Sequence, residues 1–254
     1  MDEDKLPIIK KTKKIRADVL LVKNNQVETR QKAQALIMQG SAYDPSGKII
    51  KPGTLLDESH TLIVKEQLPY VGRGGVKMAH ALKTFDIDVA DLTILDVGAS
   101  TGGFTDCAIQ RGASHIYALD VGHGQIHHSL QNKPNITIIE KTNARYPFDL
   151  PTKVHGIFID VAFISNRLIL PEVSTHLKND GFIICLIKPQ FEAGQEYVGY
   201  RGVIRDPKVH EMVITDFKTW AQDNKFNVLE LCDSPISGRN GNKEFFAYLT
   251  KNLD

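Results

Sequence analysis

The chain has 254 residues, of which 42% are hydrophobic and 24% charged, a composition typical of a globular protein with one large domain or one large and one small domain. No apolar run approaches the roughly 20 residues needed to cross a bilayer, and the polar N-terminus lacks the apolar core of a secretory signal, so we expect a cytoplasmic protein. The cysteines are odd in number and lie far apart in apolar segments, at Cys107, Cys185 and Cys232. This pattern favours buried reduced thiols over disulfides or a zinc site.

The net charge of +1 is unevenly distributed. Residues 1–68 hold 12 lysines and arginines against 9 acidic residues, whereas residues 69–254 hold 19 against 21. The basic residues near the start form a cluster of Lys10, Lys11, Lys13, Lys14 and Arg16. Such a cluster is often only a solvated tail, so by itself it says little about nucleic acid.

Residues 15–40 predict two short helices. Apolar residues from Ala17 to Val22 form the first, which Asn24 and Asn25 end. Thr29 is the expected N-cap of the second helix, and Gly40 is the expected residue just beyond its C-terminus. A β-rich stretch follows, with extended segments at 42–43, 48–50 and 61–64 and turns at 44–47 and 52–53.

This two-helix-plus-hairpin unit resembles the alpha-L RNA-binding domain, the fold of ribosomal small-subunit protein four, over residues 16–21, 28–33, 37–40 and 51–53. The resemblance implies an RNA-binding domain at 1–68 with a basic N-terminal tail, in which Arg30 and Lys32 meet RNA phosphates. We add Arg16 and Arg73 as RNA-binding candidates. Without the surrounding pattern, Arg30 and Lys32 would be read as part of an exposed helix face.

From about Leu92, apolar runs of strand length alternate with helical ones, which is typical of an α/β domain with a mostly parallel sheet. The clearest helix is Pro207–Asn224, behind Asp206 as N-cap. We therefore predict a domain at 69–254 with a seven-stranded sheet and helices on both faces. The predicted strands are Thr93–Val97, His115–Asp120, Ile136–Glu140, Gly156–Phe163, Gly181–Lys188, Asn227–Cys232 and Phe245–Thr250.

Residues 94–104 run from a strand through a glycine-rich turn into a helix. The glycine spacing is wrong for the pyrophosphate-binding GxGxxG pattern. It resembles instead the first motif of Rossmann-like methyltransferases, D-x-G-x-x-x-G-G-F, in which glycines let the backbone approach the methionine part of S-adenosylmethionine. The resemblance implies cofactor contacts from Asp96, Gly98, Ser100, Gly102, Gly103 and Phe104.

Two more cofactor contacts are expected beyond the next strands. Asp120 ends a strand about 20 residues after the glycine turn, where a carboxylate can bind both ribose hydroxyls of a nucleoside. In isolation, a turn-capping aspartate is an equally common explanation. Asn143 follows the third strand, where such enzymes usually contact adenine.

Four further segments, at 72–77, 158–165, 186–192 and 241–246, complete a resemblance to the haemolysin-A-like (TlyA) family of FtsJ-like ribosomal RNA 2′-O-methyltransferases. That resemblance implies a Rossmann-like methyltransferase that acts on a cytidine of ribosomal RNA or ribosomal subunits. It also implies a catalytic tetrad of Lys77, Asp160, Lys188 and Glu244, with Asp160 touching the cofactor as well.

These residue types suit the reaction, because a ribose hydroxyl must lose a proton as it attacks a methyl carbon. A lysine at the end of an apolar strand, near a second cation, can act as general base, and we assign this role to Lys188 with Lys77 as its neighbour. Asp160 and Glu244 would orient the two lysines. Each of these three residues also has a non-catalytic alternative role: a helix cap for Asp160, a surface ion pair for Glu244 and a phosphate contact only for Lys77.

The sequence departs from the family at Ala162, at 127–131 and in the loop 192–202, where Tyr197 and Tyr200 either stack on flipped-out bases or pack the loop. No metal-ligand cluster is visible, and we expect no membrane or DNA partner. Two other hypotheses remain. One is an RNA-binding assembly factor with an inactive methyltransferase domain, and the other is a membrane-active haemolysin, for which no amphipathic or spanning segment is evident.

Overall fold

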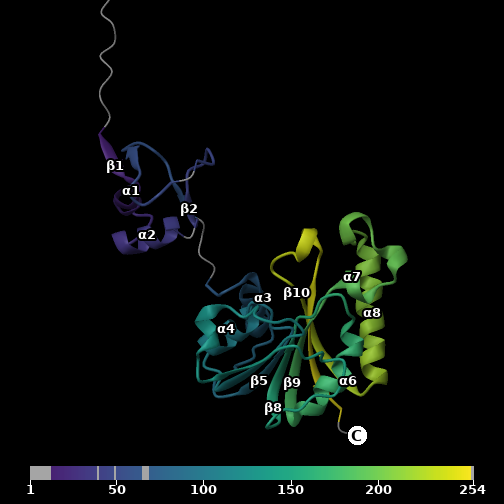
Figure 1. The fold of residues 1–254 in the computed structure, drawn as a ribbon. Helices are drawn as coiled ribbons and strands as arrows, with labels where there is room; N and C mark the ends of the chain where they lie inside the picture. The colour runs from purple at the N-terminus through teal and green to yellow at the C-terminus, as the bar shows by residue number, and fades with distance from the viewer. Residues whose placement is uncertain (1–12, 39, 49, 65–68, 253–254) are drawn as a thin grey trace, which may run out of the picture. The chain divides into compact units, whose positions relative to one another are not determined.

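The computed structural model describes residues 13–38, 40–48, 50–64 and 69–252 (Figure 1). The chain divides into two compact units, residues 1–67 and 68–254. Four of our sequence predictions include residues outside this description. They concern Lys10 and Lys11 of the basic cluster, Gln39 of the stretch 37–40, Ile49 of the extended segment 48–50, and the domain boundary at residue 68.

The smaller unit contains the two expected helices, α1 (Ala17–Lys23) and α2 (Arg30–Met38). Thr29 caps α2 as predicted, because its Oγ1 accepts a hydrogen bond of 3.2 Å from the backbone N–H of Lys32. Gly40 has a left-handed backbone with φ of 70°. Leucines from both helices form the core, together with Leu62 from beyond the turns.

Four very short strands complete this unit. They form two antiparallel pairs, β1 (Lys14–Arg16) with β3 (Leu55–Asp57) and β2 (Ala42–Tyr43) with β4 (Ile63–Val64). The sequence analysis missed β1 and β3, since three residues are too few for a visible alternation of apolar and polar side chains. Lys48 and Ile50, which were expected to be extended, lie outside any strand.

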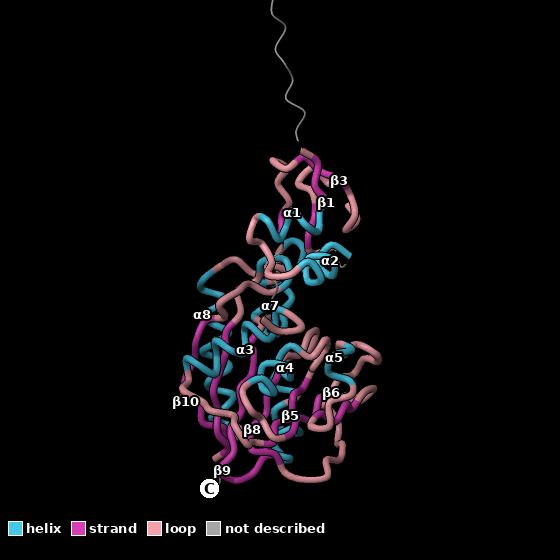
Figure 2. Tube along the Cα trace, turned by 90° about the vertical axis from the view of Figure 1, so that its left-hand side faces the viewer, coloured by secondary structure: helices cyan, strands magenta, loops and turns pink. Residues whose placement is uncertain are grey.

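The larger unit is built on one seven-stranded sheet in the order β10-β11-β9-β8-β5-β6-β7. The pairs along β9, β8, β5, β6 and β7 are parallel, and β11 is antiparallel to both of its neighbours. The view in Figure 2 shows β8, β5 and β6 side by side. The strands are β5 (Thr93–Val97), β6 (His115–Leu119), β7 (Ile136–Ile139), β8 (Val154–Ile159), β9 (Leu177–Ile187), β10 (Phe226–Asp233) and β11 (Phe245–Lys251).

Helices cover both faces of this sheet, as predicted (Figure 1). Helices α3 (Arg73–Thr84) and α4 (Gly103–Gln110) pack on one face, and α6 (Leu170–Val173) and α8 (Pro207–Asp223) pack on the other. Side chains alternate along β9, so Ile184 and Leu186 meet the first pair of helices while its neighbours meet the second. Two short helices, α5 (His128–Gln131) and α7 (Pro189–Glu192), follow β6 and β9.

Most strand boundaries agree with the prediction to within one or two residues, and Asp206 caps α8 by accepting from the N–H of Lys208 at 2.9 Å. Strand β9 begins four residues earlier than expected, at Leu177. A second correction of four residues concerns β8, which ends at Ile159 and not at Phe163. Phe163 has left the sheet, with φ of 63° and 82% of its surface exposed. The apolar run 161–164 has the composition of a strand, but in the structure it belongs to the loop that follows β8.

The chain order fixes where a ligand can bind. From β5 the chain runs through β6 and β7 on one side, and then returns to β8 on the other side of β5. In open parallel sheets the crevice at such a switch point, beyond the carboxyl ends of the strands, is the usual ligand site. A ligand site is therefore expected beside the residues that directly follow β5 and β8.

Candidate active site

The glycine-rich turn after β5 is shaped by close backbone contacts. Gly98 has φ of 81°, and a Cβ atom there would lie 2.6 Å from the carbonyl oxygen of Asp160. Gly102 caps α4 with φ of 89°, and a Cβ on Gly103 would lie 2.8 Å from the backbone nitrogen of Gly75. Only glycine satisfies these positions without displacing the neighbouring segment. The turn therefore brings three backbone segments, from α3, β5 and β8, into contact.

A cavity of about 240 Å³ opens beside this turn and is lined by Asp96, Gly98, Ser100, Gly103, Phe104 and the residues near Asp160. Asp96 is fully buried, and its Oδ2 accepts a hydrogen bond of 2.6 Å from the Thr105 hydroxyl. Its Oδ1 has no hydrogen-bond partner among the described residues. Burial, and more weakly the charge of Asp160, raises the pKa of Asp96 to about 7. Phe104 also lines this cavity, but its ring is buried against Phe158 and Phe246, so a ligand can contact little of it.

A second cavity, of about 490 Å³, continues on the far side of Gly98 and is lined by Asp120 and Asn143. Asp120 accepts hydrogen bonds from the backbone N–H groups of Ser100 at 2.8 Å and Gly122 at 2.6 Å. Asp120 therefore does cap the neighbouring turns, as the alternative interpretation predicted. Each carboxylate oxygen can accept a further hydrogen bond, so a ribose contact remains compatible with this role. Asn143 uses its side-chain oxygen to accept from the N–H of Arg145 at 3.0 Å.

The four predicted tetrad residues form two ion pairs. The Nζ atom of Lys77 lies 2.5 Å from Oε2 of Glu244, and both side chains are almost completely buried. The Nζ atom of Lys188 lies 2.5 Å from Oδ1 of Asp160 and also donates to the carbonyl oxygen of Val161 at 2.8 Å. All four residues line a third cavity, of about 320 Å³. Each ammonium group thus has its own carboxylate.

The sheet explains this convergence. Asp160 and Lys188 follow the parallel neighbours β8 and β9, so both emerge at the same edge. Strand β11 runs in the opposite direction and pairs Phe245 with Ile187, which places Glu244 at its start beside Lys188 at the end of β9. Lys77 reaches the edge from the second turn of α3.

The three cavities are contiguous. Asp160 lines all of them, and Lys188 and Ala162 line both the first and the third. The tetrad therefore borders the same space as the unpartnered oxygen of Asp96. A molecule in the first two cavities would have one end beside Lys188.

Sequence reasoning missed Glu192, a buried carboxylate at the end of α7. It accepts hydrogen bonds from the Ser165 hydroxyl and, at 2.8 Å, from the backbone N–H of Asn166. Burial raises its pKa. Glu192 thus ties the loop after β8 to the helix that begins beside Lys188. The available signal was an acidic residue in the first helical turn after the apolar strand that ends at Ile187.

Two more missed residues wall the third cavity. Phe163 lies on its rim and packs against Phe191, with ring centroids 5.2 Å apart. Asn242 is buried and connects two loops above the tetrad. Tyr197 and Tyr200, which were considered as stacking residues, are exposed but do not line this cavity.

The predicted RNA-binding residues have structural partners. Arg16 and Arg30 both bind the fully buried carboxylate of Asp18, at 2.9 and 3.0 Å, and the Arg16 contact above all holds the pKa of that carboxyl well below its usual value. Lys32 lies 3.7 Å from Glu28, one turn away. In the larger unit, the exposed Arg73 donates a hydrogen bond to the carbonyl oxygen of Ser237.

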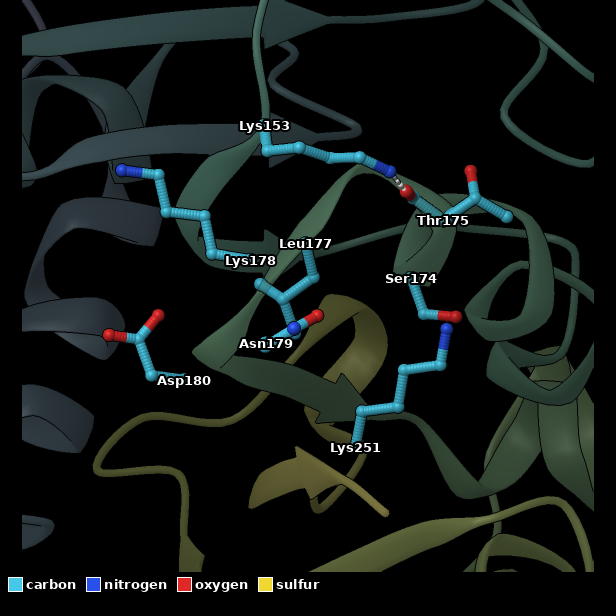
Figure 3. Close-up of a pocket in the computed structure, with 8 residues that line it drawn as sticks. All are labelled: Lys153, Ser174, Thr175, Leu177, Lys178, Asn179, Asp180 and Lys251. Atoms are coloured by element: carbon cyan, nitrogen blue, oxygen red, sulfur yellow. Dashed lines mark hydrogen bonds between the residues drawn. The ribbon is translucent and has the colours of Figure 1, made fainter. Parts of the chain in front are cut away.

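A further hollow, of about 460 Å³, lies at the opposite end of the sheet, where β8 and β9 begin (Figure 3). Its lining includes Lys153, Lys178 and Lys251, whose side chains point in different directions. Lys153 donates to the carbonyl oxygen of Thr175, and Lys178 lies 2.6 Å from Nε2 of His155. These amines do not converge on one point, unlike the groups of the tetrad.

Comparison with known proteins gives consistent results. The family described as FtsJ-like methyltransferase matches residues 70–251. "Putative rRNA methyltransferase YqxC" of Bacillus subtilis is 45% identical over 94% of this chain and 86% of its own length. "16S/23S rRNA (cytidine-2'-O)-methyltransferase TlyA" of Mycobacterium tuberculosis is 35% identical over 95% of this chain and 92% of its own length.

Solved structures agree. A structure titled "Putative hemolysin from Streptococcus thermophilus" is 41% identical and covers 95% of this chain and 90% of its own, with a TM-score of 0.73. An S-adenosylmethionine-dependent methyltransferase of Listeria monocytogenes shares the fold, with a TM-score of 0.53 at 17% identity. Within the described residues, no helix is both long and apolar enough to span a membrane.

Proposed function

The chain belongs to the FtsJ-like methyltransferase family, and from this premise we propose that it transfers a methyl group from S-adenosylmethionine to the ribose 2′-hydroxyl of a cytidine in ribosomal RNA. The observation that carries the proposal is the position of Lys188. This residue lines both the cavity beside the glycine-rich turn and the cavity that holds the tetrad.

The residues around the glycine-rich turn fit the cofactor. The buried, unpartnered Oδ1 of Asp96 suits the ammonium group of the methionine part, because an unpaired buried carboxylate oxygen is costly until a cation reaches it. Gly98 leaves room for a ligand where a side chain would meet Asp160. Asp120 and Asn143 would hold the nucleoside. When bound, the cofactor supplies an electrophilic methyl group on a sulfonium.

Lys188 is arranged to act as general base. Once the ammonium group of Lys188 has released one proton to solvent, its amine has two N–H groups and one lone pair, and two acceptors are already in place, Asp160 at 2.5 Å and the carbonyl oxygen of Val161 at 2.8 Å. With both N–H groups donated, the lone pair is left for the cavity. There it accepts the proton of the attacking ribose hydroxyl, and Asp160 stabilises the ammonium that forms.

Lys77 and Glu244 serve a different purpose in this proposal. Their ion pair is buried and fixes α3 to the start of β11, beside Lys188 at the end of β9. The rest of the rate enhancement comes from holding hydroxyl and methyl group in line. The exposed ring of Phe163 on the rim gives an unpaired base a surface to stack on.

We assign the unit at 1–67 to RNA docking, as an alpha-L RNA-binding domain. Arg16 and Arg30 would contribute in spite of their bonds to Asp18, since both remain about half exposed and each guanidinium has further donors. Phosphate contacts of this kind position the substrate without reading its sequence.

Methyl transfer to ribosomal subunits tests the function. Labelled S-adenosylmethionine should transfer its methyl group to purified subunits from a strain that lacks this protein, and ribose-methylation mapping should place it on a cytidine 2′-oxygen. The Lys188→Ala variant should lose transfer while it still binds cofactor and subunits. Near-normal turnover by this variant would contradict the mechanism. Binding without any transfer by the wild type would favour an assembly factor with an inactive methyltransferase domain.

A further inference from the structure

We propose that Arg201 and Arg239 form a phosphate clamp that binds the two phosphodiester groups flanking the target ribose. Both arginines line the third cavity with the tetrad, and they come from two separate loops, one after α7 and one before β11. This inference rests on the proposed function, because it names the residues that hold the backbone of the RNA substrate.

The charges around the cavity lead to this proposal. Lys77 and Lys188 each form an ion pair with a carboxylate at 2.5 Å, so while both pairs are intact, before Lys188 gives up its proton, the tetrad as a whole adds no net charge. The remaining charged groups in the lining are Arg201 and Arg239. Neither has a carboxylate partner among the residues that the structure describes. The cavity therefore carries an excess of two positive charges, which matches the two phosphates beside one ribose.

The backbone of both loops is held in conformations that are unfavourable for most residues. Arg201 and Asn240 have φ of 61° and 59°, in the left-handed region, and each is followed by a glycine that is also left-handed. The two strained positions are joined directly, because the side-chain amide of Asn240 donates to the carbonyl oxygen of Arg201 at 2.9 Å. Strain of this kind persists only where surrounding contacts fix it, and it is concentrated at functional sites.

Asn242 supplies the contacts that fix the loops. This side chain is only 3% exposed, and its oxygen accepts from the N–H of Ile204 at 3.1 Å. Its nitrogen donates to the carbonyl oxygens of Gly202 at 2.9 Å and Arg239 at 3.2 Å. One buried amide thus joins the backbones that carry the two arginines. The loops are ordered before RNA arrives, so binding costs less conformational entropy.

Phosphate is the anion that fits. Arginine presents a planar set of donors that matches phosphate oxygens in pairs, and a ribose that offers its 2′-hydroxyl to Lys188 has a phosphodiester on each side. Arg201 has one other contact, with its guanidinium 5.1 Å from the centre of the exposed Tyr200 ring. If stacking were its main role, its removal would weaken RNA binding without changing the salt dependence.

The test compares Arg201→Ala, Arg239→Ala and the double variant with Arg205→Ala, an exposed arginine in the same loop that does not line the cavity. Methyl transfer to purified ribosomal subunits gives KM and kcat. Binding of the same subunits between about 50 and about 200 mM salt gives the salt slope. Each single change should raise KM roughly tenfold and reduce the slope by about one, with the double variant losing about two and the control unchanged.

Both arginine side chains are exposed, so their replacement should not disturb folding. Cofactor affinity should therefore stay at the wild-type value in all four variants, and this measurement serves as the control for folding. Replacement of both arginines by lysine should restore the salt slope but only part of KM, because lysine keeps the charge and loses the paired donors. An unchanged KM and slope in the double variant would overturn the clamp while leaving the methyltransferase intact. Absence of transfer by the wild type would instead overturn the proposed function, and the binding slopes would still judge the clamp.

Discussion

The two lysines of the tetrad should differ sharply in their effect on stability. We expect Lys77→Ala to destabilise the larger unit far more than Lys188→Ala, although both should abolish methyl transfer. The reason is the depth of the two ion pairs. Lys77 and Glu244 are 10% and 3% exposed, whereas Lys188 and Asp160 are 12% and 23% exposed. Removing Lys77 leaves a buried carboxylate without its cation.

The magnitudes follow from this exposure. Breaking a buried ion pair by removing one partner costs about 3–5 kcal/mol. The carboxylate of Asp160 can be reached by water once Lys188 is gone, so that change should cost only about 1–2 kcal/mol. A double variant, Lys77→Met with Glu244→Gln, buries no charge and should recover about half of the loss, while remaining inactive.

Urea unfolding measures these differences. The single tryptophan, Trp220, lies in α8 and stacks on Phe226, so its fluorescence reports on the larger unit alone. Lys83→Ala, at an exposed position in the last turn of α3, is the matched control and should change stability by less than about 0.5 kcal/mol. Equal stability of the Lys77 and Lys188 single variants would refute the argument from burial.

Three further predictions concern the same site. Gly238→Ala should lower kcat at least about tenfold with near-normal cofactor binding in a calorimeter, because its Cβ would lie within 2.0 Å of Oε1 of Glu244, where the carboxylate now sits. S-adenosylmethionine should bind more tightly as the pH rises from about 6 to about 8. The reason is that Asp96, whose pKa is raised to about 7, must be ionised to bind the ammonium group of the cofactor. In the Asp96→Asn variant, the affinity measured by calorimetry should not change with pH. Burial raises the pKa of Glu192, so the wild type should lose part of its unfolding free energy as the pH rises. Glu192→Gln should remove this pH dependence. Urea unfolding at several pH values measures it, and a wild-type stability that rose with pH relative to the variant would contradict the prediction.

The sheet could be predicted from the sequence because each strand of the larger unit is a short apolar run bounded by turn residues, as in Thr93–Val97. The glycine turn and Asp120 could be found for a related reason, since their spacing reflects a βαβ unit in which one strand ends about 20 residues after the other. These are local features. Their three-dimensional consequences follow from the topology of a parallel sheet.

Other features depend on contacts between distant segments, and the sequence could not reveal them. The pairing of Lys77 with Glu244 depends on the antiparallel direction of β11, and that of Lys188 with Asp160 depends on the parallel pairing of β8 with β9. Phe163 was assigned to a strand, because an apolar run gives no sign that its backbone turns left-handed at the end of β8. Asn242 is one asparagine in a polar loop until the contacts with residues 202–204 are seen.

The direction of β11 also has a consequence for the synthesis of the protein. Lys77, Asp160 and Lys188 are all translated well before residues 245–251, which form the strand between β9 and β10. Until that strand emerges from the ribosome, β9 has an open edge and the buried amine of Lys77 has no counter-charge. A nascent chain therefore lacks the complete tetrad, which forms only when β11 inserts between β9 and β10.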